Sequence, residues 1–317
     1  MVQATILFMA GLILICIGGD RLVDAAVAIA RKLGIPQIVV GATIVSLGTT
    51  LPEVLVSTTA AFDGSAAIAA GNAFGSIICN TALIAGLTQT IRPTKKVEAS
   101  SLLWRSGFFF AVLIAMNVYG YVTGSYGRPV GIMLLLLFAL YAYLNIRRSA
   151  SEGEDSQEEE KDQEVSVPRQ LLVLVICAGL LYLGANLLVD NGIYIANAIG
   201  VPERVIAVTF IALGTSLPEL VTSIVSLIKG YGNVGLGNVI GANILNLLLV
   251  IGIPAAVAGI GLERSTVTVD MPLSLLVMAI LLVPILVRKR AAGGQPAVYL
   301  RGILYPFFCT VDSGKKM

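Results

Sequence analysis

Seven segments of this chain contain no Asp, Glu, Lys or Arg, and this feature restricts its fold more than any other. A helix needs about 20 apolar residues to cross the hydrocarbon core of a bilayer, and several segments are long enough. A soluble domain carries roughly a quarter charged residues, whereas this chain of 317 residues carries 13%. The sequence therefore predicts an all-α polytopic membrane protein in a lipid bilayer. The segments are Leu33–Pro52, Gly64–Ile91, Gly107–Gly127, Pro129–Ile146, Gln170–Val189, Gly230–Leu262 and Met271–Val287.

The apolar runs, with the Gly, Pro and charged residues between them, predict nine clear membrane helices. A tenth is expected near 297–311, where Arg301 and Pro306 interrupt a short apolar run. The first 20 residues contain no Lys or Arg and no convincing cleavage site, so they are interpreted as a membrane helix rather than a signal peptide. The nine helices are expected at 3–30, 37–62, 66–89, 101–120, 129–147, 170–198, 204–228, 232–258 and 270–288.

The residue types that are missing exclude several kinds of chemistry. The chain has no histidine, which excludes imidazole zinc sites and Ser-His or Cys-His nucleophile pairs. Its net charge of +2 is too small to indicate nucleic acid, and it has no Walker-type phosphate loop for a nucleotide. We therefore expect no cofactor and no nucleic-acid partner. The four cysteines lack CxxC spacing and are interpreted as small core residues: Cys16, Cys79, Cys177 and Cys309.

The chain contains an internal repeat. When it is shifted by 166 residues, residues 41–87 lie over 207–253 without a gap, and 16 of the 47 positions are identical. Chance agreement between apolar segments would favour Leu, Val and Ile, whereas these identities fall on Gly, Pro, Thr, Asn and Glu. We therefore infer a duplication. Matched pairs include Gly18/Gly184, Gly48/Gly214, Thr49/Thr215, Pro52/Pro218, Glu53/Glu219, Ser57/Ser223, Gly71/Gly237, Asn72/Asn238, Gly75/Gly241 and Asn80/Asn246.

An acidic segment separates the two copies. Arg147–Arg169 holds eight of the chain's 19 acidic residues and almost nothing apolar, which predicts a solvated linker at 148–169 on the cytoplasmic side. A calcium-sensing loop is the alternative, but the Asp and Glu spacing matches no EF-hand. The first repeat then occupies 1–147 and the second occupies 170–317.

The distribution of Lys and Arg favours an N-terminus outside the membrane, because the loops inside then collect most cations. Five helices per half is an odd number, so the second half enters from the opposite side. Such inverted halves recur in secondary transporters. With no targeting signal visible, we expect the plasma membrane of a prokaryote. The inside cations are Arg31, Lys32, Arg92, Lys95, Lys96, Arg105, Arg147, Arg148, Lys161, Arg169, Lys229, Arg288, Lys289 and Arg290.

A six-residue motif occurs in both copies, as GTTLPE at Gly48–Glu53 and as GTSLPE at Gly214–Glu219. Proline removes a helical hydrogen bond and glycine lowers helix stability further, so each motif predicts a helix break part-way through a crossing. The break should free the carbonyls at 46–50 and 212–216. These groups cannot face lipid, so they must line a polar cavity or bind a ligand. A new helix is expected at each proline, with the glutamate in its first turn.

The two glutamates are predicted to lie near the bilayer midplane. Uncharged residues fill the 19 positions from Gly34 to Glu53 and the interval from there to Asp63. An ionised group at that depth is usually functional, although each glutamate could merely complement a helix N-terminus. A set of oxygen ligands suits hard cations, and two carboxylates balance one Ca²⁺, two Na⁺ or two protons. Further oxygens come from Thr49, Thr50, Thr215, Ser216, Ser76, Asn80 and Asn246, although Ser or Asn alone more often bonds a neighbouring helix.

The segments GATIVSLGTTLPE…GNAFGSIICN and AVTFIALGTSLPE…GNVIGANILN resemble the two α-repeats of the calcium/cation antiporter superfamily, in particular of prokaryotic sodium/calcium exchangers. The resemblance covers both repeats and, more loosely, residues 1 to about 290. It implies ten helices in two inverted halves, exchange of Ca²⁺ for Na⁺ between helices 2, 3, 7 and 8, and no obligatory protein partner. It also implies that helices 1 and 6 slide to switch access.

The same resemblance implies a ligand set. The carboxylates of Glu53 and Glu219 would bind Ca²⁺ centrally and Na⁺ in turn, and the carbonyls of Thr49 and Thr215 would complete the calcium site. The flanking sodium sites would use Thr50, Ser216, Ser76 and Asn80, with Asn246 at the matched position of the second repeat.

Two residues depart from the sodium-exchanger pattern, in which Ser often stands at the position of Ala242 and Asp at that of Asn246. The missing hydroxyl weakens one prospective sodium site, and Asn lacks a third charge. A proton/calcium exchanger therefore stays open beside a sodium/calcium exchanger, as does a passive cation channel. An enzyme is not expected, because the Asp20 and Asp24 that suggest aspartyl chemistry have no apparent partner and Asp20 becomes Asn186 in the second copy.

Overall fold

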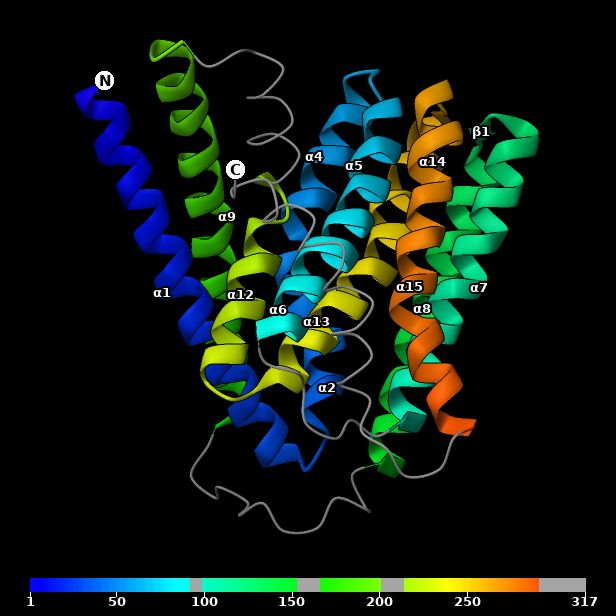
Figure 1. Cartoon of the computed structure of the whole chain (residues 1–317), viewed down its shortest axis with the longest axis horizontal. Helices are drawn as coiled ribbons and strands as arrows, with labels where there is room; N and C mark the ends of the chain where they lie inside the picture. Colours follow the sequence, from blue (N-terminus) through cyan, green and yellow to red (C-terminus); the bar gives the residue numbers. More distant parts are fainter. Residues whose placement is uncertain (92–98, 153–165, 201–213, 291–317) are drawn as a thin grey trace, which may run out of the picture.

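The chain forms a bundle of membrane-length helices (Figure 1). The computed structural model describes residues 1–91, 99–152, 166–200 and 214–290. Within them, six helical segments are long and apolar enough to span a membrane, and a seventh qualifies if the bent pair Gln37–Thr49 and Leu51–Phe62 is one span. The prediction of an all-α polytopic membrane protein is confirmed. The six are Val2–Leu33, Ala67–Thr88, Trp104–Thr123, Arg128–Asn145, Val167–Ala198 and Gly232–Ala258.

The first half begins with the long helix α1 and ends with α8. Its elements are α1 (Val2–Leu33), α2 (Gln37–Val40), the π-helix η1 (Gly41–Val45), α3 (Ser46–Thr49), α4 (Leu51–Phe62), α5 (Ala67–Ile78), the π-helix η2 (Cys79–Ala85), α6 (Gly86–Ile91), α7 (Ala99–Thr123), β1 (Ser125–Tyr126) and α8 (Arg128–Glu152).

The second half begins with the long helix α9. Its described elements are α9 (Val167–Ala198), α12 (Leu217–Ile228), α13 (Gly232–Leu245), the π-helix η4 (Asn246–Val250), α14 (Gly252–Ala258), β2 (Ile260–Gly261), the π-helix η5 (Thr266–Asp270) and α15 (Met271–Arg290).

Eight of the predicted helices coincide with these segments, as does the described part of the one predicted at 204–228. The tenth predicted helix, at 297–311, lies outside the described residues. Helix α8 continues to Glu152 and α9 begins at Val167, so residues 148–152 and 167–169, which were assigned to the linker, are helical. Polar residues such as Ser149 and Ser151 continue α8 beyond its apolar stretch, where hydropathy gives no signal.

A two-stranded pairing is the one β element of the described chain, and the sequence analysis did not predict it. Tyr126 of β1 lies opposite Ile260 of β2 in an antiparallel register. Tyr126 is buried, and its hydroxyl donates a hydrogen bond to the carbonyl of Met116 at 2.9 Å. Strands of two residues are too short to show an alternating pattern.

The first helices of the two halves, α1 and α9, run antiparallel side by side (Figure 1). A Cβ on Gly11 would lie 2.7 Å from the carbonyl oxygen of Gly184, and one on Gly18 would lie 3.2 Å from that of Cys177. Gly11, nearer the start of α1, thus contacts Gly184, nearer the end of α9, and Gly18 contacts the earlier residue Cys177. In the repeat, Gly11 corresponds to Cys177 and Gly18 to Gly184, so the shift by 166 residues converts one contact into the other, as expected for inverted halves. Small residues allow such close approach of membrane helices.

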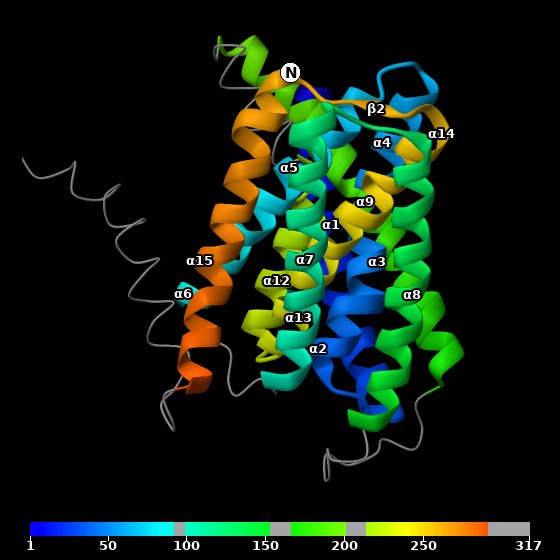
Figure 2. The ribbon, with the colours of Figure 1, turned by 90° about the vertical axis from the view of Figure 1, so that its right-hand side faces the viewer.

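Helix α13 lies at the centre of the bundle, next to α2, η1 and α3 (Figure 2). A Cβ on Gly241 would lie 2.6 Å from the carbonyl oxygen of Ala42, and Gly237 approaches the carbonyl of Ile38 still more closely. These glycines hold the second repeat directly against the segment that leads to the first helix break.

One cation assigned to the inside loops is in fact buried. Arg105 lies in α7 with no exposed surface, and its Nε donates a hydrogen bond to Oδ1 of Asn145 in α8 at 3.0 Å. The assignment of Arg105 to a loop is therefore wrong. A buried charge needs polar partners in place of water, and Asn145 provides one for Arg105.

Candidate metal-ion site at the two helix breaks

The first GTxLPE motif interrupts a helix, and a helix begins within the second. Helix α3 ends at Thr49 and α4 begins at Leu51, and the axes of the segments Gln37–Thr49 and Leu51–Phe62 differ by 43°. In the second repeat, α12 begins at Leu217 after Ser216. Each new helix has proline near its start and a glutamate, Glu53 or Glu219, in its first turn. The first predicted break is confirmed, and in the second motif the new helix begins beside its proline as predicted, while the segment before Gly214 lies outside the described residues.

Fewer carbonyls are left without a backbone donor than predicted. The N–H of Thr50 donates to the carbonyl of Ser46 at 2.9 Å, and that of Val54 donates to Thr50 at 3.1 Å. In the second repeat, the N–H of Leu220 donates to the carbonyl of Ser216 at 3.0 Å. The prediction is therefore wrong for these three carbonyls, because the helix on each side of the break extends its own hydrogen bonding. Pro52 lacks the N–H that would bind the carbonyl of Gly48, so that group remains available.

The glutamates of the two repeats meet in the interior. Glu53 and Glu219 have no exposed surface, and their carboxyl groups are close enough to interact electrostatically. Oγ1 of Thr50, at the first break, donates a hydrogen bond to Oε1 of Glu219 at 3.2 Å. Among the described residues, both carboxyl oxygens of Glu53 and Oε2 of Glu219 have no hydrogen-bond partner. Two buried acidic groups thus share one interior region, and in the described chain neither carboxyl group forms a salt bridge.

Two further hydrogen bonds cross between the repeats. Oγ1 of Thr49 donates to Oδ1 of Asn238 at 3.1 Å, and Oγ1 of Thr215 donates to Oδ1 of Asn72 at 3.3 Å. The repeat shift converts one bond into the other. The sequence analysis matched both asparagines but did not assign them to the site. A signal was present, since each is a polar identity within an apolar helix, where a partner is required.

The other predicted ligands lie on neighbouring elements. Asn80 is in η2 and Asn246 opens η4, and both are buried with amide atoms that have no partner in the described part of the chain. Ser76 is buried on α5 and Ser216 is buried at the second break, while Thr215 is half-buried there. No hydrogen bond within the described ranges joins Ser76, Asn80 or Asn246 to either carboxyl group. The π-helices at matched positions are notable because such turns are frequent at functional sites.

The donor set fits a hard cation. No group of three or more His, Cys, Asp or Glu side chains gathers anywhere in the described residues, so these residues form no site with three carboxylate or thiolate ligands. The interior offers two carboxylates with hydroxyl, amide and carbonyl oxygens. Burying carboxylates without partners is costly, and a bound cation would remove that cost.

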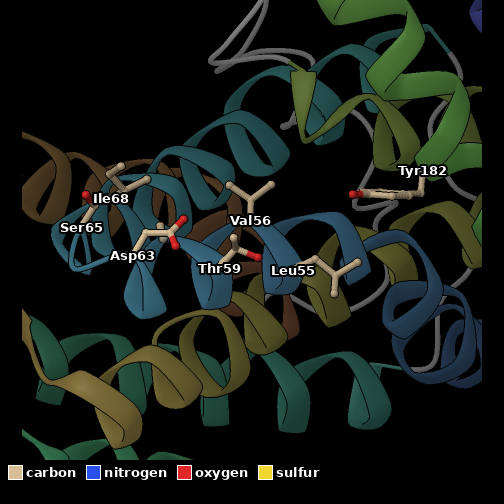
Figure 3. A pocket seen from close by; sticks show the side chains of 8 residues that line it. Leu55, Val56, Thr59, Asp63, Ser65, Ile68 and Tyr182 are labelled. Carbon is tan, nitrogen blue, oxygen red and sulfur yellow. The ribbon is translucent and has the colours of Figure 1, made fainter.

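A surface hollow lies along α4, the helix that carries Glu53 (Figure 3). It is formed by α4, α5 and Tyr182 of α9, and Asp63 is its acidic residue. Neither Glu53 nor Glu219 contributes to its lining. The carboxyl groups are therefore closed off from this hollow in the described conformation. Its lining residues are Leu55, Val56, Thr59, Ala60, Asp63, Ser65, Ile68 and Tyr182.

A family model described as "Sodium/calcium exchanger protein" matches residues 3–147 and 169–304, which is most of the chain. The chain belongs to the sodium/calcium exchanger family. It is a transporter family, as the antiporter resemblance implied, and not a family of enzymes. The gap in the match falls on the acidic segment that the sequence predicts as a linker.

Two prokaryotic relatives match the chain over most of their own length. The chain is 35% identical to the inner membrane protein YrbG of Escherichia coli over 95% of the chain and 94% of the relative. It is 27% identical to the sodium/calcium exchanger MaX1 of Methanosarcina acetivorans over 88% of the chain and 90% of the relative. The solved structure of the sodium-calcium exchanger NCX_Mj, soaked with Na⁺ and Sr²⁺, superposes with a TM-score of 0.75 at 30% identity, covering 93% of this chain and 100% of that one.

Proposed function

We propose that this family member exchanges Ca²⁺ for Na⁺ by alternating access at one site, which Glu53 and Glu219 build at the bilayer midplane. The observation that carries the proposal is the 3.2 Å hydrogen bond from Thr50 Oγ1 to Glu219 Oε1. It brings the helix break of one repeat against the carboxylate of the other. Relatives such as the sodium/calcium exchanger MaX1 support the choice of ions.

The charges of the site explain why it would exchange ions rather than leak them. Two ionised carboxylates without a cation are expensive in the membrane interior, so a change of access with an empty site is disfavoured. One Ca²⁺ or two Na⁺ would balance both charges. Competition of the two ions for Glu53 and Glu219 then couples their movements in opposite directions.

The remaining residues would complete the coordination. We assign the carbonyls of Thr49 and Thr215 to Ca²⁺, whose preferred ligands are oxygens. The side chains proposed to hold Na⁺ beside the glutamates lie at the breaks and on the adjacent helices: Thr50, Ser216, Ser76, Asn80 and Asn246. The N-terminus is proposed to lie outside the membrane and the acidic linker inside.

A sodium-gradient assay tests the proposal. Proteoliposomes that contain the full chain and are loaded with Na⁺ should take up ⁴⁵Ca²⁺ when diluted into sodium-free buffer. Glu53→Gln and Glu219→Gln keep the shape of each side chain but remove its charge, and each should abolish uptake. Uptake that survives both changes would rule out the assigned site.

Proton coupling is the second candidate, and Ala242 and Asn246 are the observations that favour it. Both are buried, and neither provides the hydroxyl or the third carboxylate of the sodium-exchanger pattern. Uptake driven by a proton gradient in sodium-free vesicles would decide for this alternative. Steady Ca²⁺ efflux with neither gradient would instead indicate a passive channel.

A further inference from the structure

The two cross-repeat hydrogen bonds lie where the backbone has lost part of its own support. Residues at a helix break lack some of the hydrogen bonds that fix carbonyl directions inside a helix. Thr49 and Thr215 each stand three residues before a proline, within such a break. A side-chain bond from either threonine therefore restrains a piece of backbone that would otherwise be loosely held.

The partner of Thr49 lies in a closely packed part of the interior. Asn238 lies fully buried in α13. A Cβ on Gly41 would lie 3.1 Å from the backbone nitrogen of Asn238, so α13 and η1 are in close contact at this point. The second repeat thus presents the Oδ1 of Asn238 to the first break from a closely packed backbone.

The partner of Thr215 connects both glutamate-bearing segments. Asn72 of α5 accepts the hydroxyl of Thr215 through Oδ1, and its Nδ2 donates to the carbonyl of Glu53 at 3.3 Å and to Oγ of Ser57 at 2.9 Å. One amide therefore joins the second break to the helix that carries Glu53.

We propose that Asn72 and Asn238 are positioning residues for ion binding, each orienting the other repeat's threonine so that the two helix breaks set the site together. This inference rests on the proposed function, because the oriented carbonyls of Thr49 and Thr215 are proposed calcium ligands. The asparagines touch no ion. They act through the threonine hydroxyls, and the inverted duplication supplies the arrangement twice.

Replacing the threonine hydroxyl tests the inference while leaving the carbonyl in place. Thr49→Val and Thr215→Val keep the side-chain volume but remove the donor, and each should raise the apparent KM for Ca²⁺ about fivefold in the proteoliposome assay. Thr49→Ser and Thr215→Ser keep the donor but lose a methyl group, and each should be less impaired than the valine variant. If packing alone mattered, the order of valine and serine variants would be reversed.

Double variants identify the partners. Thr49→Val combined with Asn238→Ala should be less harmful than the product of the single effects, because both changes remove one bond. The exchanged pairing, Thr49→Val with Asn72→Ala, is the matched control and should be closer to multiplicative. Ca²⁺ binding in detergent, with thermal unfolding to verify folding, provides a second readout for any variant that reconstitutes poorly.

Two results would overturn the inference: valine variants with unchanged Ca²⁺ affinity, or equal coupling in the bonded and exchanged pairs. Glu53→Gln is measured in parallel to separate this failure from failure of the proposed function. If Glu53→Gln abolishes uptake while Thr49→Val has no effect, only the positioning role fails. If Glu53→Gln is active, the ion site itself is wrongly placed.

Discussion

The ammonium of Lys229 forms a 2.7 Å salt bridge with Asp24 and so ties the end of α12 to α1. Asp20, one turn earlier on α1, pairs with the same nitrogen at 2.7 Å. The repeat shift places Asp63 at the position of Lys229, and Asn186 and Asp190 at those of the two aspartates. The corresponding residues of the first repeat and α9 contain no cation, so this connection belongs to one half alone.

Removing the charge of Lys229 should weaken this connection modestly. Burial of the ammonium opposes its charge, but hydrogen bonds and charge interactions with Asp20 and Asp24 outweigh it and raise the pKa of Lys229. The side chains are partly exposed, so Lys229→Gln should lower the free energy of unfolding by only about 0.2–1 kcal/mol, and less at high salt. Thermal unfolding in detergent at two salt concentrations measures the loss. Arg264→Gln, which removes an exposed cation without an ion pair in the described chain, is the control.

The contribution of Lys229 should also depend on pH. Because its folded pKa is raised above the ordinary value of 10.5, the stabilisation is fully present below pH 10.5 and is lost as pH rises through the higher folded value. The difference in melting temperature between wild type and Lys229→Gln should therefore be constant from neutral pH to about pH 10 and disappear above it. A difference that vanishes already near neutral pH would contradict this assignment.

Close packing of α1 and α9 predicts a contrast between two glycines of the same helix. A Cβ on Gly184 would lie 2.8 Å from Cγ1 of Ile15, 2.9 Å from the carbonyl oxygen of Gly11 and 3.0 Å from the backbone nitrogen of Ile15, and the two backbone atoms cannot move aside. Gly184→Ala should therefore destabilise the protein by about 1–3 kcal/mol. Gly179 has no described atom within 4 Å of a Cβ, so Gly179→Ala should be neutral or stabilising. Equal melting temperatures for the two variants would disprove this contact.

Much of the fold could be predicted because its signals are local. Charge-free runs indicate helices, and the GTxLPE motifs indicate breaks, since proline acts on its own segment. Repeat identities such as Glu53/Glu219 predicted which residues stand at equivalent places. The sequence could not show how the two copies interlock, because the bond from Thr49 to Asn238 spans 189 residues. Nor could it show that Ser46 and Thr50 retain donors for their carbonyls.

The hydrogen bond from Thr50 to Glu219 should be essential for tight ion binding. Thr50→Val would leave Oε1 of the buried carboxylate without this donor, and hydrogen bonds to charged groups contribute about 1.5–3 kcal/mol. We expect Ca²⁺ affinity to fall by about 10- to 100-fold, as measured by a binding isotherm in detergent. Thr50→Ser should bind more tightly than Thr50→Val, since the second repeat has Ser216 at this position. Equal affinity of Thr50→Val and wild type would show that the bond does not support the site.

Binding of Ca²⁺ should stabilise the folded protein through both glutamates. A ligand at 100 times its Kd stabilises the native state by about 2.7 kcal/mol, so Ca²⁺ should raise the melting temperature in detergent, and added Na⁺ should reduce that rise by competition. Glu53→Gln and Glu219→Gln should each lose the effect. Asp63→Asn removes a carboxylate at the end of α4, in the hollow of Figure 3 and away from the buried pair, and should keep it. If Asp63→Asn lost the effect while Glu53→Gln retained it, the ion would bind in the hollow, because only there would Asp63 be within reach.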